Sequence, residues 1–142
     1  MNANKIIRGS FGKLFVNGVR YGNINSFELK ATMNYTEVNV NGELCTQNVY
    51  TGYSLSGTMS LHKISSYNAN IVKDGMKSGV MPSIKFVASV DDPNSNGADT
   101  IEVENVTFDE VTLLAFTNGE IGTEDVPFKA GGYNFIDINT DI

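Results

Sequence analysis

Cys45 and His62 are the single cysteine and the single histidine of the sequence, two residue types that often serve as nucleophile and general base. A hydrolase built on them would need a nucleophile elbow such as G-x-S-x-G, which the sequence lacks. A Walker loop and a G-x-G-x-x-G fingerprint are also missing, so no phosphate or dinucleotide site is indicated. A lone cysteine excludes an internal disulfide and a cysteine-ligated metal cluster. We predict a protein that is not an enzyme and holds no cofactor.

The segment from Asp92 to Gly97 (DPNSNG) is the one candidate metal site, because it opens like the calcium loop of an EF-hand. The twelfth position of such a loop should be a bidentate Glu, and here it is Val103, between Glu102 and Glu104. Asp, Pro, Asn, Ser and Gly are also the residues that tight turns select. We interpret the segment as a turn between strands and predict no metal site.

The formal net charge of −6, on 142 residues, argues against a surface that neutralises phosphates with clustered Lys and Arg. No sequence-specific nucleic-acid partner is expected, although an acidic balance suits a channel through which DNA passes without adhering. The N-terminus lacks the apolar region of a signal peptide, and no apolar run reaches the roughly 20 residues that span a bilayer. These features predict synthesis in the bacterial cytoplasm and no stable membrane anchoring.

Strands are the main elements that would position any functional surface. In SLSGTMSLHK (residues 54–63), apolar positions and glycine alternate with polar ones, as side chains do on the two faces of a strand. The polar face carries hydroxyl groups where an ordinary exposed strand carries Lys and Glu, and its members are Ser54, Ser56, Thr58 and Ser60. The pattern predicts a core on one face and a polar, nearly uncharged surface on the other.

Two Asn-Gly pairs, Asn17-Gly18 and Asn41-Gly42, predict hairpins, because both central positions of a type I′ turn need positive φ. Between them, alternation predicts a long strand with Phe27, Leu29, Ala31, Met33 and Tyr35 on one face. The alternation changes register near Thr36, which indicates a bulge or a departure from the main sheet. We therefore predict a hairpin over residues 36–51 that projects from the body, and an N-terminal arm over residues 1–12.

One helix is predicted over residues 64–78, with Ser65 or Ser66 as N-cap and Gly79 as its stop. After Pro82 the two-residue period returns. It predicts further strands around residues 86–90, 101–103, 106–108 and 126–128, and a more continuous apolar strand from Val111 to Phe116. No linker or low-complexity segment interrupts the chain, so residues 1–142 are predicted to form a single domain.

Several short segments occur in a characteristic order, namely Gly12-Lys13-Leu14-Phe15, Glu37-Val38-Asn39-Val40, Thr51-Gly52, Gly57-Thr58, Lys63-Ile64-Ser65-Ser66, Val106-Thr107-Phe108 and Glu124-Asp125-Val126-Pro127-Phe128. On these segments the sequence resembles the tail tube proteins of contractile phage tails. The resemblance includes the tubes of defective prophage particles and of R-type, phage-tail-like bacteriocins such as diffocin, and it covers nearly the whole chain. Each segment alone is weak, and the order and spacing together carry the resemblance.

The resemblance implies a mainly β fold, a β-sandwich or half-open barrel with one flanking α-helix. It implies a structural virion protein whose copies join edge to edge into hexameric rings. The rings would stack into an inner tube, the conduit that is driven through the target envelope when the sheath contracts. The implied partners are other copies of the chain, the sheath protein, and the baseplate and tape-measure proteins. The implied location is a phage tail or an extracellular phage-tail-like particle.

The resemblance also implies roles for particular residues. The projecting hairpin would reach a neighbouring subunit or ring through apolar side chains, which are Val38, Val40, Leu44, Val49 and Tyr50. The hydroxyl face would line the lumen through Ser54, Ser56, Thr58 and Ser60, because a lumen must be wetted without being adhesive.

Three other readings remain open from the sequence. A monomeric β-sandwich module that binds carbohydrate would need an aromatic platform, and with no Trp it would depend on Tyr21, Tyr50, Tyr53 and Tyr133. A small β-barrel enzyme is disfavoured by the missing His and Cys constellations. The tube of a type VI secretion system is a variant of the tail-tube reading.

Overall fold

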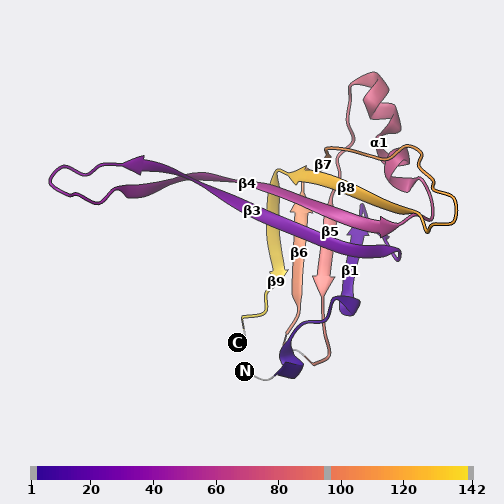
Figure 1. Cartoon of the computed structure of the whole chain (residues 1–142), viewed down its shortest axis with the longest axis horizontal. Coiled ribbons are helices and arrows are strands. Elements are labelled where there is room, and N and C mark those ends of the chain that lie inside the picture. Colours follow the sequence, from indigo (N-terminus) through magenta and orange to yellow (C-terminus); the bar gives the residue numbers. More distant parts are fainter. Residues whose placement is uncertain (1–2, 95–96, 141–142) are drawn as a thin grey trace.

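Two antiparallel β-sheets that cross face to face form the body of the protein, with one helix at an end of the sandwich (Figure 1). The computed structural model describes residues 3–94 and 97–140. The five-stranded sheet has the order β2-β1-β5-β6-β9, with β1 (Gly12–Val16), β2 (Val19–Arg20), β5 (Phe86–Val90), β6 (Asp99–Glu104) and β9 (Gly132–Asp137). The four-stranded sheet has the order β3-β4-β8-β7, with β3 (Ile24–Val38), β4 (Gln47–His62), β7 (Thr107–Phe108) and β8 (Thr123–Ala130). The predicted β-sandwich with one flanking helix is confirmed.

The core lies between the inner faces of the two sheets. Phe86 of the five-stranded sheet and Phe128 of the four-stranded sheet are fully buried, and their rings meet edge to face with centroids 5.0 Å apart. Phe27 stacks on Phe128 at 5.8 Å. Such pairs add about 0.5–1.5 kcal/mol beyond the area that they bury. The two sheets therefore pack on each other through an aromatic cluster. Its rings come from the inward-facing positions of three strands, β3, β5 and β8.

Both Asn-Gly pairs lie in the hairpins that they predicted, but only the first forms the predicted type I′ turn. Asn17 and Gly18 both have positive φ (50° and 84°) and join β1 to β2 as a type I′ hairpin. In the second pair only Gly42 has positive φ (90°), and Glu43 N donates to Val40 O at 3.0 Å. A turn with one positive φ at its second central residue is of the type II kind, which does not close a two-residue hairpin. The tip is instead a loop over residues 39–46.

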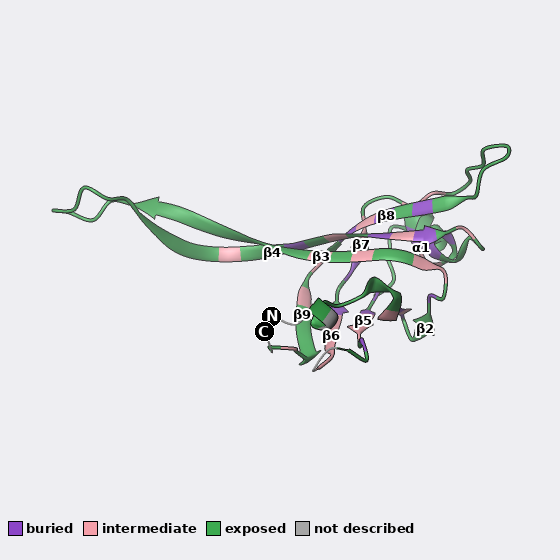
Figure 2. Cartoon of the chain, turned by 60° about the horizontal axis from the view of Figure 1, so that its bottom comes forward, coloured by how far each residue is buried: buried purple, intermediate pink, exposed green. Residues whose placement is uncertain are grey.

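Strands β3 and β4 continue past the body as a two-stranded ribbon, residues 32–54, which projects far to one side (Figures 1 and 2). Strand β8 accompanies β4 only from His62 to Leu55, so no third strand among the described residues pairs with the ribbon. The ribbon therefore begins earlier than the predicted boundary at residue 36. The register change also differs from the prediction: Asn34 pairs with Gly52 and Tyr35 with Tyr50, which makes Thr51 the extra residue of a bulge in β4.

Helix α1 (Tyr67–Ser78) begins three residues after the predicted start at residue 64. Lys63 N still donates to Gly122 O at 2.8 Å, so the chain stays beside β8 until there and turns into the helix through an N-cap at Ser66. Gly79 ends the helix in the left-handed conformation (φ 82°), which glycine adopts at no steric cost.

The strand predicted from Val111 to Phe116 is wrong. After β7 the chain runs as an irregular loop, and Leu113, Leu114 and Phe116 are strongly exposed. Asp109 N makes the last backbone bond to β8, at Pro127 O, and only Val111 packs against the core beyond it. An apolar run adopts strand geometry only where a neighbouring strand takes its backbone bonds, and no described strand lies there.

Candidate assembly surfaces

Cys45 and His62, the side chains capable of nucleophilic or base chemistry, lie far apart on exposed surfaces. Cys45 is in the loop at the ribbon tip, and His62 ends β4 on the outer face of the four-stranded sheet. Within residues 3–94 and 97–140 no three His, Cys, Asp or Glu side chains gather as a metal site would require. In the same residues no helix is long and apolar enough to cross a membrane.

Asp92, the first residue of the loop that resembles a calcium site, is buried and engaged by protein groups. Its Oδ2 accepts bonds from the backbone N (2.9 Å) and Nε (2.8 Å) of Arg8, and its Oδ1 accepts from Arg8 Nη2 and Asn94 N (both 2.9 Å). The guanidinium and the Asn94 amide hold the pKa of Asp92 well below its usual range. Val103 is fully buried and faces the core. Residues 95–96 of this turn lie outside the described residues. Asp92 therefore anchors the N-terminal arm.

The outer face of the four-stranded sheet carries the hydroxyl row that the sequence singled out. Ser54, Ser56 and Thr58 are exposed and Ser60 is half-buried, while Leu55, Met59 and Leu61 between them are buried. Their neighbours across the strands on this face are Ser26, Glu28, Lys30 and Thr32 on β3, and Thr123, Asp125, Pro127 and Lys129 on β8.

The charges on this outer face are largely matched. Lys30 Nζ lies 3.0 Å from Glu28 Oε1, and Lys129 Nζ lies 3.8 Å from Asp109 Oδ1. Exposed pairs of this kind contribute little to stability. They matter for the electrostatic potential of this face. A surface of hydroxyl groups with interspersed opposite charges attracts neither polyanions nor polycations strongly.

The ribbon has no core of its own. Every residue from 32 to 54 is exposed except Gly52, which is intermediate. The five hairpin residues named above are 41% to 107% exposed, with Val38 the least and Leu44 the most, and Met33, Tyr35 and Tyr53 are also exposed. Its only formal charges are Glu37 and Glu43. A two-stranded ribbon is marginally stable on its own in water, and monomeric proteins rarely expose apolar patches of this kind.

A buried polar cluster beneath α1 was not predicted. The Tyr21 hydroxyl donates to Asn68 Oδ1 at 2.5 Å, and burial, with the nearby Tyr67 and Glu124, raises the pKa of Tyr21 above its usual value. Glu124 is 3% exposed and its Oε2 accepts from Lys63 Nζ at 3.3 Å, while Oε1 has no protein partner. One sequence signal for it existed: Glu124 shares the inward parity of Val126 and Phe128.

The tyrosines that a carbohydrate platform would need do not form a flat surface. Tyr21 is buried, and the other three are each about half exposed. Tyr50 meets Tyr35 edge to face, and Tyr53 meets Tyr133 in the same way, at centroid distances of 5.8 Å and 6.1 Å. Rings locked edge to face do not present the adjacent coplanar faces on which a sugar stacks.

Comparison with known proteins gives concordant results. A family model described as phage tail tube protein matches residues 1–137. Two Bacillus subtilis (strain 168) proteins match over 130 residues, which is 90% of this chain and 88% of each relative. One is the uncharacterized protein YqbM, at 31% identity. The other is the phage-like element PBSX protein XkdM, at 30% identity.

Among solved structures, the fold matches a chain of the sheath-tube complex of the extracellular contractile injection system PVC, in its extended state. The TM-score is 0.70 at 12% identity, covering 97% of this chain and 99% of that one. A chain of the anti-feeding prophage tube-terminating cap matches with TM-score 0.70 and 11% identity, over 95% and 93% of the two chains. A chain of the gene transfer agent virion matches with TM-score 0.62 at 10% identity, over 90% and 97%. At these identities the likeness shows the shared fold.

Proposed function

The chain belongs to the phage tail tube protein family, and from that membership we propose that it forms the inner tube of a contractile phage tail or R-type bacteriocin. It would be made in the bacterial cytoplasm, assemble into hexameric rings, and stack into a conduit driven through the target envelope on sheath contraction. The observation that carries the proposal is the four-stranded sheet, which combines a hydroxyl outer face with open edges.

Open edges support ring formation. Strand β3 runs for 15 residues and, among the described strands, pairs only with β4, while the opposite edge is the two-residue β7. An unpaired edge exposes backbone donors and acceptors that attract another strand. Closing six copies edge to edge would remove these edges, as a barrel does.

The outer face would then line the lumen. In this arrangement Ser54, Ser56, Thr58 and Ser60 face the passage, with paired charges around them. Such a wall stays wet without binding DNA or protein, which suits a tube through which cargo moves. The core face of the same sheet stays covered by the five-stranded sheet, so the lumen wall is backed by a rigid layer.

The ribbon would make the contact between rings. It extends well beyond the body, and Val38, Val40, Leu44, Val49 and Tyr50 lie on it without cover. Burying such side chains against a neighbouring copy would contribute about 1.5–3 kcal/mol for each that becomes fully buried. The sheath, the baseplate and the tape-measure protein are the further partners that we propose. The matched solved structures include sheath-tube and baseplate assemblies.

Electron microscopy of the purified protein tests the proposal directly. We expect a monomer or small ring at low concentration, and uniform hollow tubes at high concentration or on a nucleating baseplate. A strictly monomeric protein at about millimolar concentration, with neither rings nor tubes in the images, would refute it.

The double substitution Val38→Asp with Val40→Asp tests the ribbon. Charge in the contact between rings should abolish stacking, while thermal melts and circular dichroism should match the parent, because the ribbon lies outside the core. Ser65→Asp with Asn70→Asp, which also adds two charges but at exposed positions before and on α1, outside the ribbon and the outer face of the four-stranded sheet, is the matched control and should still form tubes. Normal tubes from the first variant would show that the ribbon tip is not the joint.

A further inference from the structure

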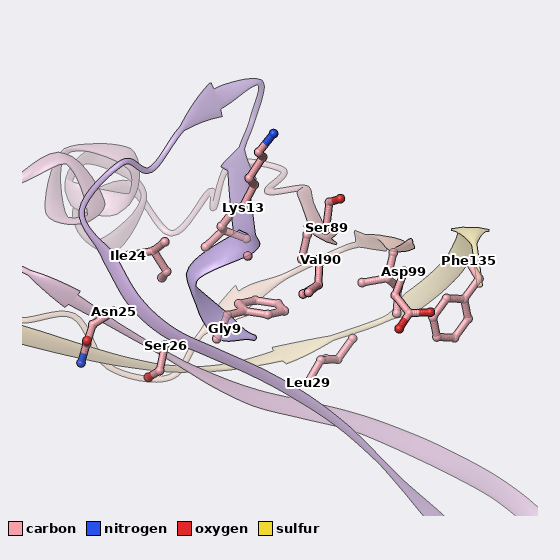
Figure 3. A pocket seen from close by; sticks show the side chains of 15 residues that line it. Gly9, Lys13, Ile24, Asn25, Ser26, Leu29, Ser89, Val90, Asp99 and Phe135 are labelled. Atoms are coloured by element: carbon pink, nitrogen blue, oxygen red, sulfur yellow. The ribbon is translucent and has the colours of Figure 1, made fainter. Parts of the chain in front are cut away.

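The cleft between β3 and the five-stranded sheet is open on the side of the bare β3 edge (Figure 3). It has a volume of about 480 Å³. Ile24, Phe27 and Leu29 of β3 form one wall, and Val90, Ile101 and Phe135 belong to the opposing wall. Lys13 and Asp99 are the charged groups of the lining. The interior is thus mainly apolar, and Phe135 is still 44% exposed, so the sandwich is unsealed on this side.

The opposite edge of the same sheet carries an unsupported apolar segment. Directly after β7, Leu113, Leu114 and Phe116 are 60%, 82% and 88% exposed. The segment 109–122 contains Asp109, Glu110 and Glu120 and no Lys or Arg. Segment 3–13, which borders the cleft through Gly9, Gly12 and Lys13, contains three cations and no carboxylate side chain. Because Arg8 is already paired with Asp92 and the Lys13 side chain points away from the cleft (Figure 3), the segment and the cleft match in their apolar surfaces.

The strand register places the two features at the same height. Phe108 of β7 pairs with Phe128 of β8, and Phe128 pairs with Gly57 of β4. Gly57 in turn pairs with Leu29 of β3. From Phe108 the chain continues in the direction of Pro127, toward the end of the sheet where Leu61 pairs with Ile24. The segment therefore lies along the β7 edge at the same level as residues 24–29 on the β3 edge, and these residues line the cleft.

We propose that residues 109–116 of one copy occupy the cleft of the next copy in the ring, an inference that rests on the proposed function. When the β7 edge of one copy meets the β3 edge of another, this segment arrives at the cleft mouth. Leu113, Leu114 and Phe116 enter between Phe27 and the five-stranded sheet. The occupant seals the sandwich that each free copy leaves open.

Disulfide cross-linking in assembled tubes tests the contact. In a Cys45→Ser background, Ile24→Cys combined with Leu113→Cys should give, under a mild oxidant, a ladder of covalent oligomers on non-reducing gels, because Ile24 lines the cleft. Pairing Leu113→Cys with Asn48→Cys, a ribbon position, is the control and should give at most a trace of cross-link. A parent that forms no rings or tubes would overturn the proposed function and this contact with it. Tubes that form normally but never cross-link would overturn this contact alone.

A triple substitution tests whether the apolar side chains of this segment stabilise the assembly. Leu113→Ser, Leu114→Ser and Phe116→Ser together should leave the melting temperature within a few degrees of the parent, because these side chains are exposed in the free copy. The concentration needed for assembly, measured by sedimentation, should rise at least tenfold. Ile136→Ser, an exposed apolar residue on β9 that does not line the cleft, should leave it unchanged. Assembly of the triple variant at the parent's concentration would contradict the proposal and assign the segment to another partner, such as the sheath.

Discussion

Strands β3 and β4 contain two regions with the same local pattern and opposite environments. In the anchored region, residues 24–31 and 55–62, alternation buries Met59 and Leu61 against the five-stranded sheet. In the ribbon, residues 32–54, the same alternation leaves Met33 exposed, and Tyr53 is half exposed beside Tyr133. Both regions are antiparallel pairs of strands, and the bulge at Thr51 interrupts the pairing in the ribbon. The two regions differ in whether a second sheet packs against them. Alternation of side chains therefore does not by itself create a buried core.

The difference assigns the two regions different tasks. The anchored region provides the stability of a single copy, because its inward face meets Phe86, Val126 and Phe128 in a closed cluster. The ribbon contributes little to that stability and instead carries apolar surface for a partner. Substitutions in the two regions should therefore separate folding from assembly.

The largest contrast should come from two methionines. Met59→Ala should lower the free energy of unfolding by about 2–5 kcal/mol, because Met59 is fully buried and the surrounding core closes only partly around the cavity. Met33→Ala, at a position 58% exposed, should change it by less than about 0.5 kcal/mol. Urea unfolding of both variants measures the difference. Equal effects would mean that the ribbon shares in the core of the free protein.

A glycine in the anchored region should give the next largest effect. A Cβ on Gly57 would overlap the Glu28 carbonyl oxygen and lie 2.6 Å from the Phe128 ring, so Gly57→Ala forces the core apart. Overpacking of this kind costs about 1–3 kcal/mol. Ser54→Ala, three residues away and pointing outward, introduces the same side chain and should be nearly neutral. A Gly57→Ala protein as stable as the parent would show that Phe128 has room to move.

Amide hydrogen exchange should divide the two strands within a free copy. Amides of residues 55–62 should exchange with the slow rates of the global core, and those of residues 47–54 much faster, because two strands without a third are marginally stable in water. On assembly the ribbon amides should slow down. Uniform protection along β4 in the monomer would contradict the division, and fast ribbon exchange in tubes would exclude the ribbon as the joint.

A pH series should show the smallest effect. The pKa of Asp92 is held below its usual value, so the Arg8 pair stabilises the fold above about pH 3.9, the unfolded value, and is lost as pH falls toward the folded one. Melting temperatures between about pH 5 and pH 2.5 should therefore fall less steeply in Arg8→Met than in the parent. Glu37→Gln, in the ribbon, should leave the slope unchanged. Parallel slopes for parent and Arg8→Met would mean that the arm is not held by this pair.

Much of the fold followed from local signals. Alternation in residues 54–63 predicted both faces of β4, and Asn17-Gly18 predicted its turn, because backbone geometry at these sites depends on the residues themselves. The helix was predicted with its stop at Gly79, and only its first turn differed. The buried polar cluster beneath α1 had one signal in the sequence, the acidic residue Glu124 at an inward-facing position. A search for alternating apolar residues did not identify it.

The errors share one cause. Residues 111–116 have the composition of a strand but find no partner strand, and the predicted tight turn at Asn41-Gly42 lacks the second positive φ. Both depend on where distant segments lie. The tip of the ribbon has no packed layer to tighten its loop into a two-residue turn, and the loop after β7 has no neighbour among the described strands to take its backbone bonds.

The sequence by itself determined most of the strands, which side of each of these is apolar, and that one surface is rich in hydroxyl groups, since these depend on side-chain type and a period of two. Only the tertiary structure decided that Arg8 reaches Asp92, that β8 stops supporting β4 at Leu55, and that an open cleft and an exposed segment lie at opposite edges of one sheet. Burial depends on which chain segment lies opposite, and that segment can be any distance away in sequence.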